Sequence, residues 1–426
     1  MREYTDRHFR RLARLLSRRA TLYSEMHKPA AIVAAQEAGR ERQLLARGST
    51  HGSEVLQLGG NVPGALAAAA ARAVAYGYGG VDLNAGCPSV VAGGGDFGAS
   101  LMRDATRTAA CLEAMMEAVE KAARESGLEA APVVSLKCRV AVAETENEAL
   151  EQRERGEVAL EEGLREYLGN SVMRVGVRNV TVHARQAVMR GLSPSANREV
   201  PPLMHGVVAR TAAWAAASGV RVTPNGGVDS EERAREVLQG GSGDLAGVMA
   251  GRWVLLRPLD LARVDSVFYG DERHADGGLA FARGALEAYG EHIELELAAA
   301  GGASPAELAL PLALVAAQLE DDEDCEWAEG GETLLECIEA VAQPLLAERR
   351  RGGLGKALAA VGGKKVGAKH RRSRAEAARM SRAARAPTVT VGAPLRASEA
   401  ATSGAGNTHA LPNGGGRRWQ TLELEL

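Results

Sequence analysis

The sequence is poor in aromatic residues, which supply 4% of its 426 positions, and no apolar run is long enough to cross a bilayer. The core must therefore rest on valine, leucine and alanine. Residues 1–20 are polar and rich in arginine, which excludes a secretory signal there. The length allows two or three globular domains with a large core.

Cysteine is scarce as well. Its residues are odd in number and irregularly spaced, which excludes a disulfide framework and a zinc motif; they are Cys87, Cys111, Cys138, Cys325 and Cys337. We therefore expect reduced thiols. The expected location is the cytoplasm, or a plastid or mitochondrion if a targeting segment precedes Met1.

The net charge of −3 hides two blocks of opposite sign. Residues 349–386 hold thirteen lysines and arginines and a single acid, Glu376, whereas residues 320–329 are strongly acidic. Either block is typical of a solvated or disordered surface. The basic block is also compatible with nucleic-acid contact.

A strand-then-helix pattern repeats through the first 250 residues. Strands are predicted at 20–26, 54–60, 81–86, 132–140, 179–185, 220–227 and 245–252. Continuous apolar strands that alternate with helices indicate a parallel sheet covered on both faces. Seven such units predict an α/β fold of the (β/α)8 TIM-barrel class that lacks one strand, because an open sheet usually stops at about five or six.

The missing strand is expected to be the first, because residues 6–19 already predict a helix that follows a loop. A barrel short of one strand exposes two sheet edges. We therefore expect that the sequence starts after this strand; the alternative is that another segment fills the gap.

The barrel domain is predicted at 1–270, with an unusually charged segment at 141–170. Residues 278–347 predict a small domain of two or three amphipathic helices. Residues 350–426 are rich in Gly, Ala, Arg and Ser and show little periodicity, which predicts a disordered basic tail.

Polar side chains occur where the predicted strands end, which is the edge that carries chemistry in this fold. A single such residue is usually a turn cap or a satisfied core residue, but Lys137 lies inside an apolar strand and needs a polar partner. Their joint occurrence favours a common site. The residues are Gln57, Asn84, Cys87, Lys137, His183, Arg185, Asn225 and Arg252.

The last two predicted strands lead into "NGG" (225–227) and "GR" (251–252). Glycine N–H groups and an arginine at this place are typical of the phosphate site of such barrels. A phosphate-anchored ring with a lysine and a glutamine beside it indicates flavin mononucleotide, FMN.

Cys87 follows the strand at 81–86 and faces the same barrel mouth. Its thiol could be a nucleophile, a general acid or a structural filler. A nucleophile would need a base to activate it. Beside a flavin that delivers hydride, a neutral thiol can instead donate a proton to the neighbouring carbon.

Several motifs in the same order resemble the tRNA-dihydrouridine synthases. They are "VDLNAGCPS", "GGGDFGASLM", "VSLKCRV", "VTVHARQAVMRGLSPSANREVPPL", "TPNGGV" and "GVMAGR". The segment 183–203 is similar to the A-type subgroup, which modifies uridines 20 and 20a of the tRNA D-loop. The resemblance covers about residues 1–270 and, more weakly, the helical region to 360.

The resemblance implies an FMN-dependent TIM barrel with a helical tRNA-binding domain, which reduces the C5–C6 bond of uridine with electrons from NADPH. Hydride would reach C6 from the flavin, and Cys87 would protonate C5. Asn84 would orient the uracil, and Ser195 and Arg198 would contact tRNA, as would Arg185 and Arg190 on a positive surface. We expect a monomer without metal. The implied FMN-binding residues are Gln57, Lys137, His183, Asn225, Gly226, Gly227, Gly251 and Arg252.

Two other functions remain open at this point. One is an FMN-dependent TIM-barrel oxidoreductase that acts on a small molecule, against which the segment 180–203 and the basic tail argue. The other is an inactive RNA-binding homologue, because the family's first strand, with its flavin-contacting Pro-Met stretch, has no counterpart here.

Overall fold

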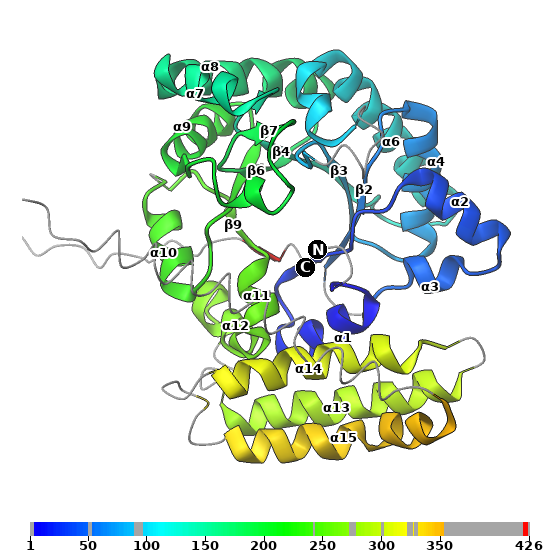
Figure 1. Ribbon diagram of the computed structural model, residues 1–426. Coiled ribbons are helices and arrows are strands. Elements are labelled where there is room, and N and C mark those ends of the chain that lie inside the picture. The colour runs from blue at the N-terminus through cyan, green and yellow to red at the C-terminus, as the bar shows by residue number, and fades with distance from the viewer. Residues whose placement is uncertain are drawn as a thin grey trace, which may run out of the picture.

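The computed structural model describes residues 4–49, 53–88, 97–241, 243–271, 278–299, 302–321, 327, 331–352 and 421–424. Their parallel strands form a closed barrel in the order β1-β10-β9-β8-β6-β4-β3-β2, viewed end-on in Figure 1. The predicted (β/α)8 architecture is therefore confirmed. The strands are β1 (Thr21–Tyr23), β2 (Glu54–Leu58), β3 (Gly80–Asn84), β4 (Val133–Arg139), β6 (Asn179–His183), β8 (Arg221–Asn225), β9 (Gly247–Ala250) and β10 (Thr421–Leu424).

Strand β10 occupies the place of the missing first strand. It pairs in parallel with β9, where Leu422 lies opposite Val248, and with β1, where Thr21 lies opposite Glu423. Another segment of the chain therefore fills the gap, as the alternative prediction had it. The prediction of disorder for 350–426 was wrong for these four residues, and for 350–352, which end helix α15. The rest of that predicted tail lies outside the described residues.

Helices cover the barrel because a helix follows each barrel strand from β1 to β9 along the chain. Several begin at side-chain caps: Asp6 accepts hydrogen bonds from backbone N–H groups of α1, and Asp104 and Ser230 do the same for α6 and α10. The helices are α1 (Arg7–Leu16), α2 (Pro29–Glu37), α3 (Glu41–Leu45), α4 (Pro63–Ala75), α6 (Ala105–Glu125), α7 (Glu146–Glu154), α8 (Glu157–Leu168), α9 (His205–Ala216), α10 (Glu231–Gln239), α11 (Arg252–Leu256) and α12 (Leu261–Tyr269).

Shorter elements complete the barrel region. The 3-10 helices are η1 (Gly98–Arg103), η3 (Ala196–Arg198) and η4 (Pro258–Asp260), and the π-helical turn η2 is Gly169–Met173. Strands β5 (Val142–Ala143) and β7 (Ala187–Val188) pair outside the barrel.

The barrel strands alternate in polarity with the period of two that a pleated strand imposes. In β3 and β4, Val81, Leu83 and Leu136 belong to the large core between strands and helices. The residues between them are polar. They form an inner layer of buried side chains: Gln57, Asp82, Asn84, Ser135, Lys137, Arg139, Thr181, His183, Thr223 and Asn225.

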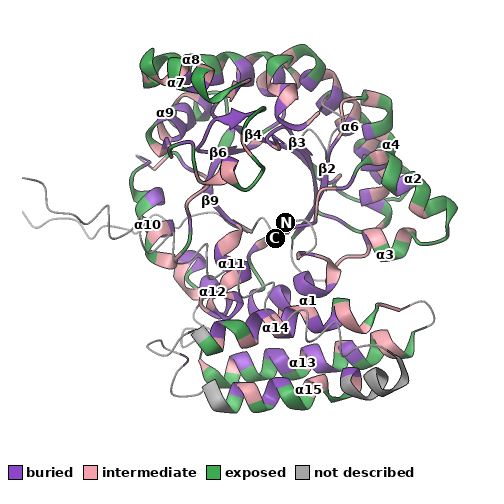
Figure 2. Ribbon diagram, viewed as in Figure 1, coloured by how far each residue is buried: buried purple, intermediate pink, exposed green. Residues whose placement is uncertain are grey.

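The helical region comprises α13 (Leu279–Ala298), α14 (Pro305–Asp321) and α15 (Gly331–Gly352), within and slightly beyond the predicted range. It packs on α1 and shares one hydrophobic core with the barrel, and its outer surfaces are exposed (Figure 2). At this junction Arg7 donates two 2.6 Å hydrogen bonds to the carboxylate of Glu296. The ring atoms His8 Nδ1 and His292 Nε2 lie 2.9 Å apart and share a hydrogen bond. Among the described residues, no helix is both long and apolar enough for a membrane span.

Candidate active site

Strand register brings the predicted polar residues to one end of the barrel. Asn84 ends β3 opposite Lys137 of β4, and Arg139, His183 and Asn225 are opposite one another on β4, β6 and β8. Because parallel strands present their carboxyl ends at the same edge, these side chains surround one opening. We call this opening the barrel mouth.

The turn that carries Cys87 is fixed by Asn84. Its Oδ1 accepts hydrogen bonds from the N–H groups of Gly86, at 3.1 Å, and Cys87, at 3.0 Å. The Cys87 carbonyl accepts from Ala99 N–H at 2.9 Å. Gly98 has φ +68°, and a Cβ there would lie 2.5 Å from the Cys87 carbonyl oxygen, so this close approach requires glycine. The thiol is half-buried at the end of β3.

A buried hydrogen-bond chain connects this turn to Gln57. Asn84 Nδ2 donates to Gln57 Oε1 at 2.9 Å, and Gln57 Nε2 donates to Asp82 Oδ2 at 3.0 Å. Ser135 Oγ donates to the other Asp82 oxygen at 2.8 Å. The carboxylate accepts only, so it sets the orientation of both amides. Asn84 therefore holds the Cys87 turn, and one Nδ2 hydrogen is left for a ligand.

His183, Asn225 and Gly226 form the opposite side of the mouth. His183 Nδ1 and Asn225 Oδ1 are buried and have no hydrogen-bond partner among the described residues. Asn225 Nδ2 donates a hydrogen bond to the Met249 carbonyl at 3.0 Å. Gly226, with φ +101°, leaves open the space where a Cβ would come within 3.0 Å of the His183 ring. Orphaned polar atoms beside a glycine backbone suit a planar, hydrogen-bonding ligand.

Burial and, after it, nearby positive charge keep His183 neutral. Burial lowers the pKa of His183 well below its ordinary value, because the charged ring loses hydration. Nearby cations lower it further, in the order Arg139, Lys137, Arg185 and Arg252. A neutral ring can accept as well as donate a hydrogen bond, which the imidazolium form cannot.

Two arginines, Arg185 and Arg252, add positive charge near His183. Arg252 Nη1 lies 3.2 Å from Glu199 Oε1, with both side chains partly exposed. Arg185 is 8% exposed and donates to the Pro201 carbonyl at 2.6 Å, so little of its side chain reaches the surface. Burial lowers the pKa of Arg185 to about 10, and Arg252 adds to this shift. This cation pair suits an anionic group at the mouth.

The segment after β6 carries the predicted RNA contacts. Ser195 is exposed and Arg198 is half-buried in η3, while Arg190 is exposed and pairs with Glu144 at 2.6 Å. Asn197 is fully buried between them. It donates to the Val188 carbonyl at 2.9 Å and accepts from Val188 N–H at 2.8 Å, which fastens η3 to β7.

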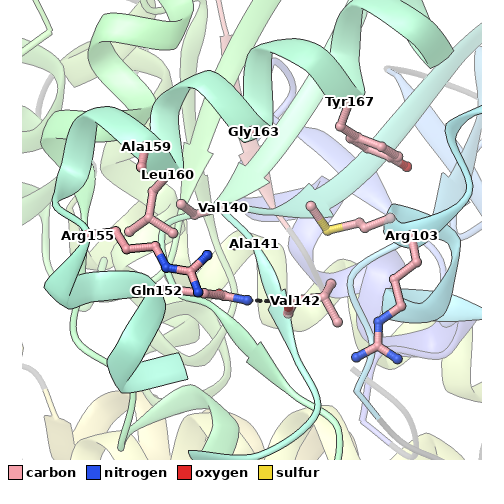
Figure 3. Close-up of a pocket in the computed structure, with 11 residues that line it drawn as sticks. Arg103, Val140, Ala141, Val142, Gln152, Arg155, Ala159, Leu160, Gly163 and Tyr167 are labelled. Atoms are coloured by element: carbon pink, nitrogen blue, oxygen red, sulfur yellow. Dashed lines mark hydrogen bonds between the residues drawn. The ribbon is translucent and has the colours of Figure 1, made fainter. Parts of the chain in front are cut away.

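Another hollow lies outside the mouth, with a volume of about 250 Å³. Figure 3 shows it between α7–α8 and β4–β5, with Arg155 and Arg103 on opposite sides and Gln152 bonded to the Val142 carbonyl. No predicted site residue lines it. The surrounding segment 141–170 is rich in glutamate, which disfavours RNA there.

Sequence reasoning missed several residues of the mouth. Asp82 and Ser135 were not singled out, although an acid inside a fully buried strand is a strong signal of a polar partner. Arg139 lies two residues after Lys137, on the same face of β4, and this spacing could have revealed it.

Comparisons with known proteins point to one family. The model of the family described as dihydrouridine synthase (Dus) matches residues 1–294. The tRNA-dihydrouridine(20/20a) synthase of Pseudomonas aeruginosa is 36% identical over 272 residues, which is 64% of this chain and 71% of the relative. The enzyme of the same name from Shewanella oneidensis is 36% identical over 273 residues, with the same coverage.

A third relative of that name, from Xanthomonas campestris pv. campestris, is 34% identical over 299 residues, or 70% of this chain and 76% of the relative. Among solved structures, DHODH from Eimeria tenella in complex with ferulenol aligns over 58% of this chain and 63% of its own. Its TM-score of 0.33 and identity of 11% are too low to bear on the fold.

Proposed function

Since the chain belongs to the dihydrouridine synthase family, we propose that it reduces uridine to 5,6-dihydrouridine in the tRNA D-loop, at positions 20 and 20a, with FMN as cofactor and NADPH as reductant. One observation carries the proposal. The Cys87 turn and the group formed by His183, Asn225 and Gly226 face one barrel mouth, in a chain whose family performs this reaction.

The residues of the mouth fit FMN by their chemistry. The heteroatoms of a flavin ring need hydrogen-bonding partners, and four side chains of the mouth are suited to them. They are Lys137, His183, Gln57 and Asn225. Gly226, Gly227, Gly251 and Arg252 are suited to its phosphate, since glycine backbone and a guanidinium both accommodate a dianion. When bound, the reduced flavin supplies the hydride that uracil C6 receives.

Cys87 completes the reduction by general-acid catalysis. As C6 gains hydride, the electron pair of the C5–C6 bond takes the proton from the Cys87 sulfur, which leaves a thiolate that water reprotonates. Asn84 fixes the turn so that the thiol stays at the end of β3. Its remaining Nδ2 hydrogen is available to a uracil oxygen.

The substrate base must leave its stack to reach a barrel mouth, so the RNA around it has to be gripped. We assign this role to Ser195, Arg198 and Arg190 beside the mouth, with Arg185 adding positive charge beneath them. The helical region α13–α15 would extend the RNA surface. The basic block 349–386 lies largely outside the described residues and is a further candidate.

The decisive experiment combines the purified chain, FMN, NADPH and tRNA that lacks dihydrouridine. Nuclease digestion and mass spectrometry should detect dihydrouridine at positions 20 and 20a, and flavin absorbance should report cofactor binding. Flavin binding with NADPH oxidation but unmodified tRNA would contradict the proposed substrate. Absence of flavin binding would contradict the cofactor.

A further inference from the structure

Arg139 joins two loops of the mouth that lie far apart in the sequence. It ends β4 and is 4% exposed. Its Nε donates to the Gly86 carbonyl at 2.9 Å. Its Nη1 donates to the carbonyls of Gln186, at 3.0 Å, and Asn197, at 2.9 Å. One guanidinium thus satisfies buried backbone acceptors on both loops.

On one side, Arg139 holds the peptide that precedes the thiol. Gly86 is the residue before Cys87, and its N–H is bonded to Asn84. The carbonyl of the same residue is bonded to Arg139. The Cys87 turn is therefore fixed from both sides, by an amide oxygen of β3 and a guanidinium of β4.

On the other side, Arg139 holds the segment that carries the RNA-contacting residues. Asn197 is the central residue of η3, between Ser195 and Arg198 in the chain. Gln186 is anchored independently, because its side chain donates to the Ala149 carbonyl at 3.1 Å. Any shift of η3 must therefore strain a bond to the same guanidinium that positions the Cys87 turn.

We propose that Arg139 is a positioning residue that locks the Cys87 turn to the segment 186–198, so that the thiol and the RNA-contacting residues are placed as one unit. This inference rests on the proposed function for its catalytic consequence. The hydrogen bonds that attach the Cys87 turn and the segment 186–198 to Arg139 do not depend on that function. The guanidinium is needed because its N–H donors point in fixed directions within one plane, so they can bind carbonyls on both loops at once. A lysine ammonium is instead a point charge at the end of a flexible side chain.

The test uses Arg139→Lys and Arg139→Met in the full-length chain that also carries Cys325→Ser. Cys111, Cys138 and Cys337 are buried, so a maleimide should report on Cys87. Arg14→Lys is the matched control. Arg14 is also buried, at 4% exposure, and also donates to backbone carbonyls, but those of Ser17, Arg18, Ala20 and Ser53, before β1 and β2.

We expect both Arg139 variants to change the maleimide rate of Cys87 by about threefold or more, because the turn is released. For Arg139→Lys we also expect kcat to fall by about tenfold or more, with the flavin content retained. Arg14→Lys should lower the thermal stability but leave the maleimide rate unchanged. An unaltered maleimide rate in folded Arg139→Lys overturns the inference.

A second variant decides the matter if the Arg139 variants do not fold. Asn197→Ala leaves Arg139 in place but frees η3 from Val188. The maleimide rate of Cys87 should then also change by about threefold or more, and an unchanged rate contradicts the coupling. If the parent chain binds flavin but makes no dihydrouridine, the proposed function fails, while the maleimide rates still decide the role of Arg139.

Discussion

Glu199 Oε1 lies 3.2 Å from Arg252 Nη1, so the arginine assigned to the flavin phosphate is paired with an acid of the segment after β6. Both side chains are more than one third exposed. An ion pair of this kind contributes roughly 0–1 kcal/mol, because solvent screens it. A phosphate dianion at the mouth would therefore compete with Glu199 for the same guanidinium.

Glu199→Gln should strengthen FMN binding by about two- to fivefold, since it removes this competitor and one negative charge near the phosphate. Fluorescence titration of the flavin-free chain measures the effect. Glu144→Gln is the control, because Glu144 pairs with Arg103 and Arg190 instead. Weaker FMN binding by Glu199→Gln would mean that Glu199 orients Arg252 rather than competing with phosphate.

Cys87→Ala should retain FMN but lose turnover by about 10²–10⁴-fold, the usual contribution of a general acid. Dihydrouridine formed per enzyme, measured by mass spectrometry, is the readout. Cys111→Ala, in the core between α6 and the barrel, should affect stability rather than turnover of the folded enzyme. Full activity of Cys87→Ala would refute the proton-donor role.

Asn84→Ala removes the acceptor of two backbone N–H groups and the donor to Gln57. We expect a stability loss of roughly 1–3 kcal/mol from the unsatisfied groups, and a clear fall in turnover. Asn84→Asp keeps the acceptor for the Cys87 turn but loses the donor to Gln57. It should therefore preserve more turnover than Asn84→Ala, and equal losses would show that the turn does not depend on Oδ1. Denaturant unfolding and single-turnover assays separate the two effects.

Strand β10 can be tested by Leu422→Pro. Leu422 lies inside β10 and is paired with Val248 of β9. Proline has no N–H group to donate to the neighbouring strand, so it should disrupt the pairing there. The unfolding temperature should fall by several degrees and flavin should dissociate more readily. Leu422→Val, which keeps the N–H and favours a strand, should behave like the parent chain. Identical unfolding of the proline variant would show that the barrel does not need β10.

Stability should fall on acidification from pH 6.5 toward 4. Burial lowers the pKa of His8 to about 3 and that of His27 to about 4, from 6.5. As the pH falls below 6.5, these histidines therefore take up protons in the unfolded chain before they do so in the folded one. The contribution of each histidine to the free energy of unfolding is complete above pH 6.5 and decreases by about 1.4 kcal/mol per pH unit below it. Burial raises the pKa of Asp6 to about 6, which partly offsets the loss, because this acid takes up its proton more readily when folded.

Chemical denaturation at several pH values measures this dependence. His8→Gln, a neutral replacement, should flatten the curve between pH 6.5 and 4, although its stability at pH 7 is lower. An unchanged slope in this variant would show that His8 does not titrate on unfolding.

The sequence alone determined the barrel and the residues at its mouth. Strand runs such as "VDLN", "VTVH" and "VTPN" alternate with period two, so one side of each run joins the helices and the other enters the barrel. Parallel strands end at a common edge. Asn84, Lys137, His183 and Asn225 were therefore predictable as neighbours before any contact between them was seen.

Only the tertiary structure decided which segment closes the barrel and which partners the buried polar groups choose. The run "TLELEL" alternates like any exposed strand, and nothing local to it specifies an edge. Its place at β1 and β9 follows from closure of the other strands, which leaves those two edges facing each other. Likewise, the amide of Asn84 and the guanidinium of Arg139 are assigned by acceptors on other strands and loops. Local periodicity fixes the face on which a side chain lies, but a hydrogen bond depends on distances across the closed barrel.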